Sequence, residues 1–335
     1  MFQHLLVPLD GSLRAERALP LAAHLARASG GTVTLLRVVP HPAPLDTFAP
    51  TGYTMYACIM ERETEDAAYY LKQLSSSHRA LRDVNVATEV HTGAPAHVIL
   101  HYAQMHDIDL LVLCSHGETG FKRWMLGSVA LQVARHSTVP ILVLNARSEA
   151  ASELPSGEQP FSILVALDGS PLAESALVPA AHLCASLAAP NQGRLHLAMI
   201  VPQLHLVRDE EAVMAHMHAE DMNAARLYLS GVEHRLQEGE LAQLYLAVSS
   251  SAISGNDVAA ILIRVAERGE CIGNLEGFRG CDVIALATHG RSGPVRWVMG
   301  SVTERVLGTT TLPLLIVRPC LVESEKKGHE TGCWI

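Results

Sequence analysis

Short apolar runs alternate along this chain with longer segments whose apolar positions recur at helical spacing. In the first half the runs predict strands at HLLVPL (4–9), TVTLLRVV (32–39), VNVATEV (84–90), DLLVLC (109–114) and PILVLN (140–145). The segments between them predict helices over 13–28, 61–82, from Pro95 onward and over 124–136, with a proline-rich loop at 40–60. Strands that are apolar on both faces and separated by helices are typical of a parallel sheet covered on two sides.

The same pattern then occurs a second time. HLLVPLDGS (4–12) matches SILVALDGS (162–170), and STVPILVLNAR (137–147) matches TTLPLLIVRPC (310–320). A repeat of this size is a whole domain. We therefore expect one domain over 1–147, a polar linker over 148–160, a second domain over 161–320 and a disordered tail over 321–335. The second copy is longer, and we place part of its extra length in residues 268–282.

Composition narrows the class of protein. The chain has 335 residues, enough for two domains, and 49% of them are apolar. The formal net charge of −9 argues against nucleic acid or an anionic membrane as partner. No apolar run approaches the ~18 residues that span a bilayer, and the first residues do not resemble a signal peptide. Seven scattered cysteines without CxxC spacing indicate reduced thiols, so we expect a cytoplasmic protein.

One repeated segment carries the candidate chemistry. It reads LLVLCSHGETGFKRWMLGSVA at 110–130 and VIALATHGRSGPVRWVMGSVT at 283–303. Glycines let backbone N–H groups approach phosphate oxygens, and a helix that follows directs its positive end at an anion. Parallel sheets bind ligands outside the carboxyl ends of their strands, where Asp10 and Asp168 also lie. The sequence therefore predicts two phosphate-binding sites, one in each half.

These residues resemble the universal stress protein family in its tandem two-domain form, over nearly the whole chain. The resemblance implies two doubly wound, Rossmann-like α/β domains, each a five-stranded parallel sheet of order 3-2-1-4-5 with helices on both faces. It also implies ATP as ligand, with or without magnesium, and a role in regulating a stress response or dormancy through a protein partner. A pseudo-dimer within the chain is implied too, with a homodimer formed by further pairing through the last strand. Catalysis is expected to be absent or limited to weak ATP hydrolysis.

The family's nucleotide-binding members share Gly, two residues, Gly, nine residues, Gly, then Ser or Thr. Here the first glycine is replaced in both halves, and the later positions are kept. Carried over in order, the first half supplies Cys114, Gly117, Gly127, Ser128 and Val129, and the second half supplies Ala287, Gly290, Gly300, Ser301 and Val302. Arg291 would help to hold a triphosphate, whereas the first half has Glu118 at that place. We expect both loops to bind nucleotide, the second better than the first; the alternative is that both are structural relics.

The strand ends complete the expected sites. Asp10 and Asp168 would accept hydrogen bonds from adenosine or help to hold magnesium, or they would simply form a turn and a helix cap. The remaining expected residues are apolar: Val38 and Ile200 would offer backbone groups to adenine, and Pro8 and Ala166 would line its edge. Core packing is an equally good interpretation of these four. Three functions stay open: a nucleotide-binding regulator, a nucleotide-free scaffold, and a slow ATPase, for which no P-loop lysine follows the last glycine.

Overall fold

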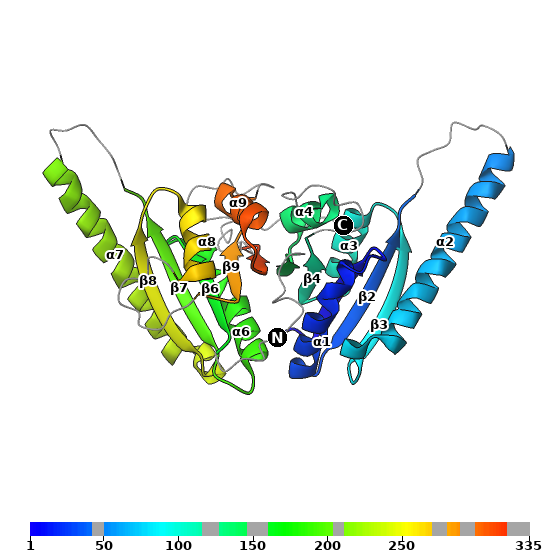
Figure 1. Ribbon diagram of the computed structural model, residues 1–335, viewed down its shortest axis with the longest axis horizontal. Helices are drawn as coiled ribbons and strands as arrows, with labels where there is room; N and C mark the ends of the chain where they lie inside the picture. The colour runs from blue at the N-terminus through cyan, green and yellow to red at the C-terminus, as the bar shows by residue number, and fades with distance from the viewer. Residues whose placement is uncertain are drawn as a thin grey trace, which may run out of the picture.

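The computed structural model describes residues 1–41, 50–115, 127–145, 160–203, 211–269, 280–288 and 299–319. Two α/β halves lie side by side, with α4 and α9 near the centre and α2 and α7 at the two outer ends (Figure 1). The first half contains β1 (His4–Leu9), η1 (Ala15–Arg17), α1 (Ala18–Ser29), β2 (Thr32–Val39), α2 (Pro50–Ser77), η2 (Arg79–Leu81), β3 (Asn85–Thr92), α3 (Pro95–Met105), β4 (Leu110–Cys114), α4 (Ser128–His136) and β5 (Ile141–Leu144). The second contains β6 (Ser162–Leu167), α5 (Pro171–Glu174), α6 (Leu177–Ala188), β7 (Arg194–Val201), α7 (Glu211–Glu238), η4 (Glu240–Leu244), β8 (Ala247–Ser254), α8 (Val258–Arg268), β9 (Val283–Ala287), α9 (Ser301–Thr309) and β10 (Leu314–Val317).

The strands form a single sheet in the order β3-β2-β1-β4-β5-β10-β9-β6-β7-β8. Within each half every pair is parallel, and the order read from the outer edge is third, second, first, fourth and fifth strand. The predicted fold class, two doubly wound α/β halves, is confirmed. The strand ends of β1 and β4, and of β6 and β9, flank the point where strand order reverses, which is where such sheets bind ligands.

The two halves are joined through their last strands. β5 and β10 pair antiparallel, with Leu142 opposite Leu315. Because β10 is bonded to β9 on one side and β5 on the other, it offers no free edge to another chain. The expectation that a homodimer forms by pairing through the last strand is therefore wrong: that pairing is made inside the chain.

Helices cover both faces of the sheet. One buried cluster packs α1, α2, α6 and α7 on one face, through residues such as Leu19, Leu71, Leu183 and Leu229. The other packs α3, α4, α8 and α9 on the opposite face. The first cluster contains β5 residues of the first half together with Leu315 and Val317 of the second. The halves thus share a core as well as a sheet.

Two boundaries differ from the sequence prediction. The expected loop over 40–60 ends early, because α2 begins at Pro50 and runs to Ser77. Proline is tolerated in the first turn of a helix, where its missing N–H has no intrahelical partner to lose. The helix expected over 13–28 begins as the 3-10 turn η1 and becomes α-helical only at Ala18. Residues 148–159 and 321–335, expected as linker and tail, lie outside the described residues, so those domain boundaries stay predictions.

Candidate functional site

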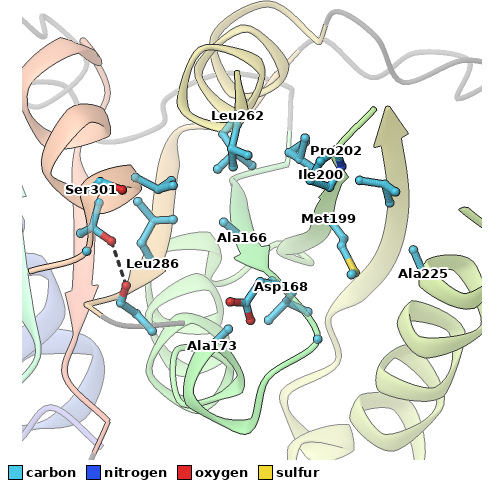
Figure 2. A pocket seen from close by; sticks show the side chains of 18 of the residues that line it. Ala166, Asp168, Ala173, Met199, Ile200, Pro202, Ala225, Leu262, Leu286 and Ser301 are labelled. Atoms are coloured by element: carbon cyan, nitrogen blue, oxygen red, sulfur yellow. Dashed lines mark hydrogen bonds between the residues drawn. The ribbon is translucent and has the colours of Figure 1, made fainter. Parts of the chain in front are cut away.

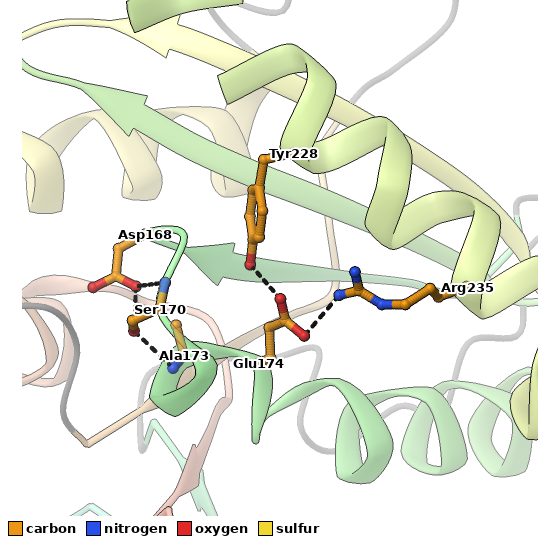
Figure 3. A network of polar contacts seen from close by, with 6 residues as sticks. All are labelled: Asp168, Ser170, Ala173, Glu174, Tyr228 and Arg235. Carbon is orange, nitrogen blue, oxygen red and sulfur yellow. Dashed lines mark hydrogen bonds and ion pairs between the residues drawn. The ribbon is translucent and has the colours of Figure 1, made fainter. Parts of the chain in front are cut away.

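An Asp-Gly-Ser turn follows the first strand of each half. In the second half, Asp168 Oδ1 accepts hydrogen bonds from the Ser170 N–H (2.9 Å) and from its hydroxyl (2.6 Å), and Ser170 Oγ accepts from the Ala173 N–H (3.2 Å) (Figure 3). The first half repeats this geometry at Asp10 and Ser12. The glycine of each turn has a positive φ, +87° at Gly11 and +83° at Gly169, a conformation that residues with a side chain rarely adopt. Each aspartate therefore shapes its turn, which holds one carboxylate oxygen in position, and the serine hydroxyl accepts from the backbone that follows. A ligand-binding role for the two aspartates stays a prediction.

The third glycine of the repeated pattern has a different role from the one expected. The Gly300 N–H donates to the Thr288 carbonyl at 2.8 Å, and the Gly127 N–H donates to the Ser115 carbonyl at 2.7 Å. A Cβ on Gly300 would lie 3.0 Å from the Thr288 oxygen, so glycine allows the helix to start against the end of β9. Since this N–H is already bonded within the protein, it is not the donor that would face a phosphate.

The donors that remain are those of the first turn of α9. Ser301, Val302 and Thr303 occupy this turn, whose N–H groups have no partner inside the helix. Among the described residues no side chain caps this N-terminus. The helix macrodipole adds partial positive charge at the same point. This end of α9 can therefore bind an anion.

A cavity of about 690 Å³ connects the Asp-Gly-Ser turn with the start of α9 (Figure 2). Its wall is apolar at Met199, Leu262 and Leu286, and it is polar where Asp168 and Ser301 border it from opposite sides. The volume lies within the ~300–1,000 Å³ of small-molecule sites. Every predicted second-half site residue that the structure describes lines it: Ala166, Asp168, Ile200, Ala287, Gly300, Ser301 and Val302.

The corresponding cavity of the first half is much smaller. It measures about 180 Å³ and is lined by all the described residues predicted there: Pro8, Asp10, Val38, Cys114, Gly127, Ser128 and Val129. Burial raises the pKa of the Cys114 thiol to about 12, so at neutral pH this side chain is an uncharged packing group. The remaining predicted residues, Gly117, Gly290 and Arg291, lie outside the described residues. The structure thus gathers two sets of predicted residues into two pockets of unequal size.

Sequence reasoning missed a tyrosine–glutamate pair beside each turn. The Tyr70 hydroxyl donates to Glu16 Oε1 at 2.8 Å, and the Tyr228 hydroxyl donates to Glu174 Oε1 at 2.9 Å (Figure 3). Burial and the neighbouring carboxylate raise the pKa of both phenols, which therefore stay protonated as donors. The repeat could have revealed them, because Ala-x-x-Tyr-Leu occurs at 67–71 and again at 225–229.

The described residues contain neither a metal-binding cluster nor a membrane-spanning helix. No group of three histidine, cysteine, aspartate or glutamate side chains converges there as a metal site. Nor does any helix in that part of the chain combine the length and apolar character needed to cross a membrane.

Comparisons with known proteins agree on one family. The universal stress protein family model matches residues 1–145 and again 161–318. The universal stress protein YxiE of Bacillus subtilis is 35% identical over 148 residues, covering 43% of this chain and 99% of its own. A universal stress protein of Mycolicibacterium smegmatis is 23% identical over 94% of this chain and 97% of its own. The crystal structure of a universal stress protein from Archaeoglobus fulgidus superposes with a TM-score of 0.63 at 18% identity, covering 95% of this chain and 99% of that one.

Proposed function

Since this chain belongs to the universal stress protein family in its tandem two-domain form, we propose that it binds an adenine nucleotide of the ATP class in its second half. Occupancy of this site by nucleotide would regulate a stress response through a protein partner. One observation carries the proposal: a single cavity of about 690 Å³ joins a fixed carboxylate, an apolar slot lined by Met199, Leu262 and Leu286, and a helix N-terminus that no side chain of the described residues caps. A nucleotide offers the matching series of sugar hydroxyls, flat base and phosphates.

The backbone of β7 supports the placement of the base. The Val201 carbonyl accepts from Gly255 on the β8 side. Because successive residues of a strand direct their backbone groups to opposite neighbours, those of Ile200 point toward the β6 side. The β6 ladder ends there, at the Leu167–Met199 pair. The Ile200 N–H is used in that last pair, where it faces the Leu167 carbonyl, and the Ile200 carbonyl lies beyond it. This carbonyl can accept a hydrogen bond from adenine.

The polar ends of the cavity take the rest of the nucleotide. The phosphates would lie at the start of α9, against the first-turn amides and the Ser301 hydroxyl. Asp168 lies at the other end, where a carboxylate suits sugar hydroxyls better than phosphate oxygens. Magnesium, where present, would bind the phosphate oxygens.

We further propose that the protein binds its nucleotide in the cytoplasm. Four cysteines in the described part of the chain are unpaired, in keeping with a reducing cytoplasm. A homodimer would have to form away from β10, whose two sides are both paired.

The first prediction tests the carboxylate of the second half. Asp168→Asn should weaken ATP binding about 10- to 100-fold, because a hydrogen bond to a charged group contributes about 1.5–3 kcal/mol. An asparagine oxygen can still accept the two hydrogen bonds from Ser170, so the turn should survive. Isothermal titration calorimetry with ATP measures the change.

Asp10→Asn is the matched control, since it makes the same replacement in the same turn of the first half. It should leave the affinity of the second-half site unchanged. A wild-type protein that titrates with no adenine nucleotide, and carries none after purification and acid extraction, would contradict the proposal and favour a nucleotide-free scaffold.

A further inference from the structure

The two pockets differ at one strand position that lies outside the repeated glycine pattern. Arg37 on β2 pairs with Leu9 at the end of β1. In the second half the equivalent residue is Met199, which pairs with Leu167 at the end of β6. A cation on a long side chain therefore occupies the place that an uncharged thioether occupies in the other half.

The Arg37 side chain lies across the Asp-Gly-Ser turn. Its Nη1 donates to the Leu9 carbonyl at 3.3 Å. Its guanidinium atoms lie 3.3–3.5 Å from the place where a Cβ on Gly11 would be. Its charge also acts on Tyr70, where it opposes the rise in pKa caused by burial and by Glu16. The guanidinium group is thus located between the turn, the end of β1 and the face of α2.

The same region is open in the second half. Gly169, Met199 and Tyr228 all line the large cavity. Their counterparts Gly11, Arg37 and Tyr70 are described by the structure but do not line the small one. Figure 2 shows Met199 and Asp168 bordering the open space, with Ala225 of α7 to the right of Met199. The guanidinium group thus lies at the first-half counterpart of the cavity wall that Gly169 and Met199 form in the second half.

The second half does have a cation nearby, but it leaves the cavity free. Arg235 reaches Glu174 from further along α7, with Nη2 2.7 Å from Oε2 (Figure 3). Arg235 does not line the cavity. In both halves a cation thus accompanies the tyrosine–glutamate pair, and only in the first half does it come from the strand beneath the pocket.

We infer that Arg37 closes the first-half site to adenine nucleotides, so that the chain binds one nucleotide rather than two. This inference rests on the proposed function of the second half. The duplicated chain would then contain one ligand-responsive half and one half held permanently in a ligand-free form by its own side chain. Cys114 adds bulk at the other side of the small cavity, where the second half has Ala287.

Reciprocal exchange of the two residues tests the inference. Equilibrium dialysis with radiolabelled ATP gives the number of nucleotides bound per chain for wild type, Arg37→Met, Met199→Arg and the double exchange. We expect one for wild type, two for Arg37→Met, none for Met199→Arg and one for the double exchange. In the double exchange, adding Asp10→Asn should weaken binding about tenfold, whereas adding Asp168→Asn should not.

The outcomes separate the inference from the proposed function. A wild type that binds two nucleotides overturns the closure by Arg37 and leaves the proposed function intact, whereas a wild type that binds none overturns the proposed function itself. An Arg37→Met chain that stays at one nucleotide, or a Met199→Arg chain with wild-type affinity, also overturns the closure. Should Arg37→Met fail to fold, as judged by circular dichroism, Arg37→Ala decides by the same count.

Discussion

Replacing Leu315 with alanine is expected to lower the free energy of unfolding by about 2–5 kcal/mol, the usual cost of truncating a buried leucine. Leu315 is 0% exposed and lies opposite Leu142 across the pair of strands that joins the halves. Both leucines belong to the cluster that contains residues of both halves. We therefore expect wild type to unfold in a single transition, and the substitution to lower the midpoint of that whole transition. Differential scanning calorimetry and urea titration measure both effects.

Leu227→Ala is the control for this substitution. Leu227 lies on α7 of the same half and is 75% exposed, so its truncation should change stability by no more than about 0.5 kcal/mol. Two separate unfolding transitions in wild type, with only one of them shifted by Leu315→Ala, would show that the halves are energetically independent despite the shared sheet.

Lowering the pH is expected to reduce the free energy of unfolding by about 3 kcal/mol through protonation of His196, since a pKa difference of one unit corresponds to about 1.4 kcal/mol. His196 is 1% exposed on β7, with Nδ1 2.9 Å from Ser249 Oγ and Nε2 2.9 Å from Ser251 Oγ. Burial lowers its pKa to about 4, from about 6.5 in an unfolded chain. Between these two pH values the unfolded chain binds more protons, so stability rises with pH. The stability that comes with a neutral His196 is therefore fully present above about pH 6.5 and is lost as the pH falls to about 4.

Urea unfolding of wild type and His196→Gln from pH 7.5 to pH 4 checks this prediction. Burial also lowers the pKa of His24 and His182, which add a pH dependence of the same sign, so the comparison between the two proteins isolates His196. Glutamine stays neutral throughout and should flatten the profile. His101→Gln, at an exposed position of α3, should keep the wild-type slope. If the free energy of unfolding changed equally with pH in wild type and His196→Gln, the pH dependence could not be assigned to His196.

The sequence identified most of the fold because its signals are local. β2 spans Thr32–Val39, the exact apolar run predicted, and α3 begins at the proline that was expected to start it. The duplicated Asp-Gly-Ser turn was also recognisable, since its glycine conformation and its serine cap depend only on neighbouring residues. The sequence also indicated which of the described residues line the pockets. Parallel strands bring their carboxyl ends to one edge of the sheet, so residues that follow the strands converge there.

Local sequence patterns failed where a residue's role depends on a contact with another segment of the chain. Gly300 looked like a phosphate-facing glycine, but its N–H is bonded to the Thr288 carbonyl at the end of a neighbouring strand. The tyrosine–glutamate pairs join residues 54 positions apart, and although the tyrosine segment is repeated, nothing in it indicates which distant residue the hydroxyl contacts.

The sequence by itself thus determined two α/β halves, their strand–helix alternation and the places where pockets form. Only the tertiary structure decided that β5 and β10 join the halves into one sheet, and that the two pockets differ in size. The physical reason is that backbone conformation follows from nearby residues, whereas edge pairing and cavity volume depend on which distant side chains share a space. Arg37 and Met199 occupy equivalent strand positions, but the Arg37 guanidinium lies over the turn at Gly11, whereas Met199 lines the large cavity.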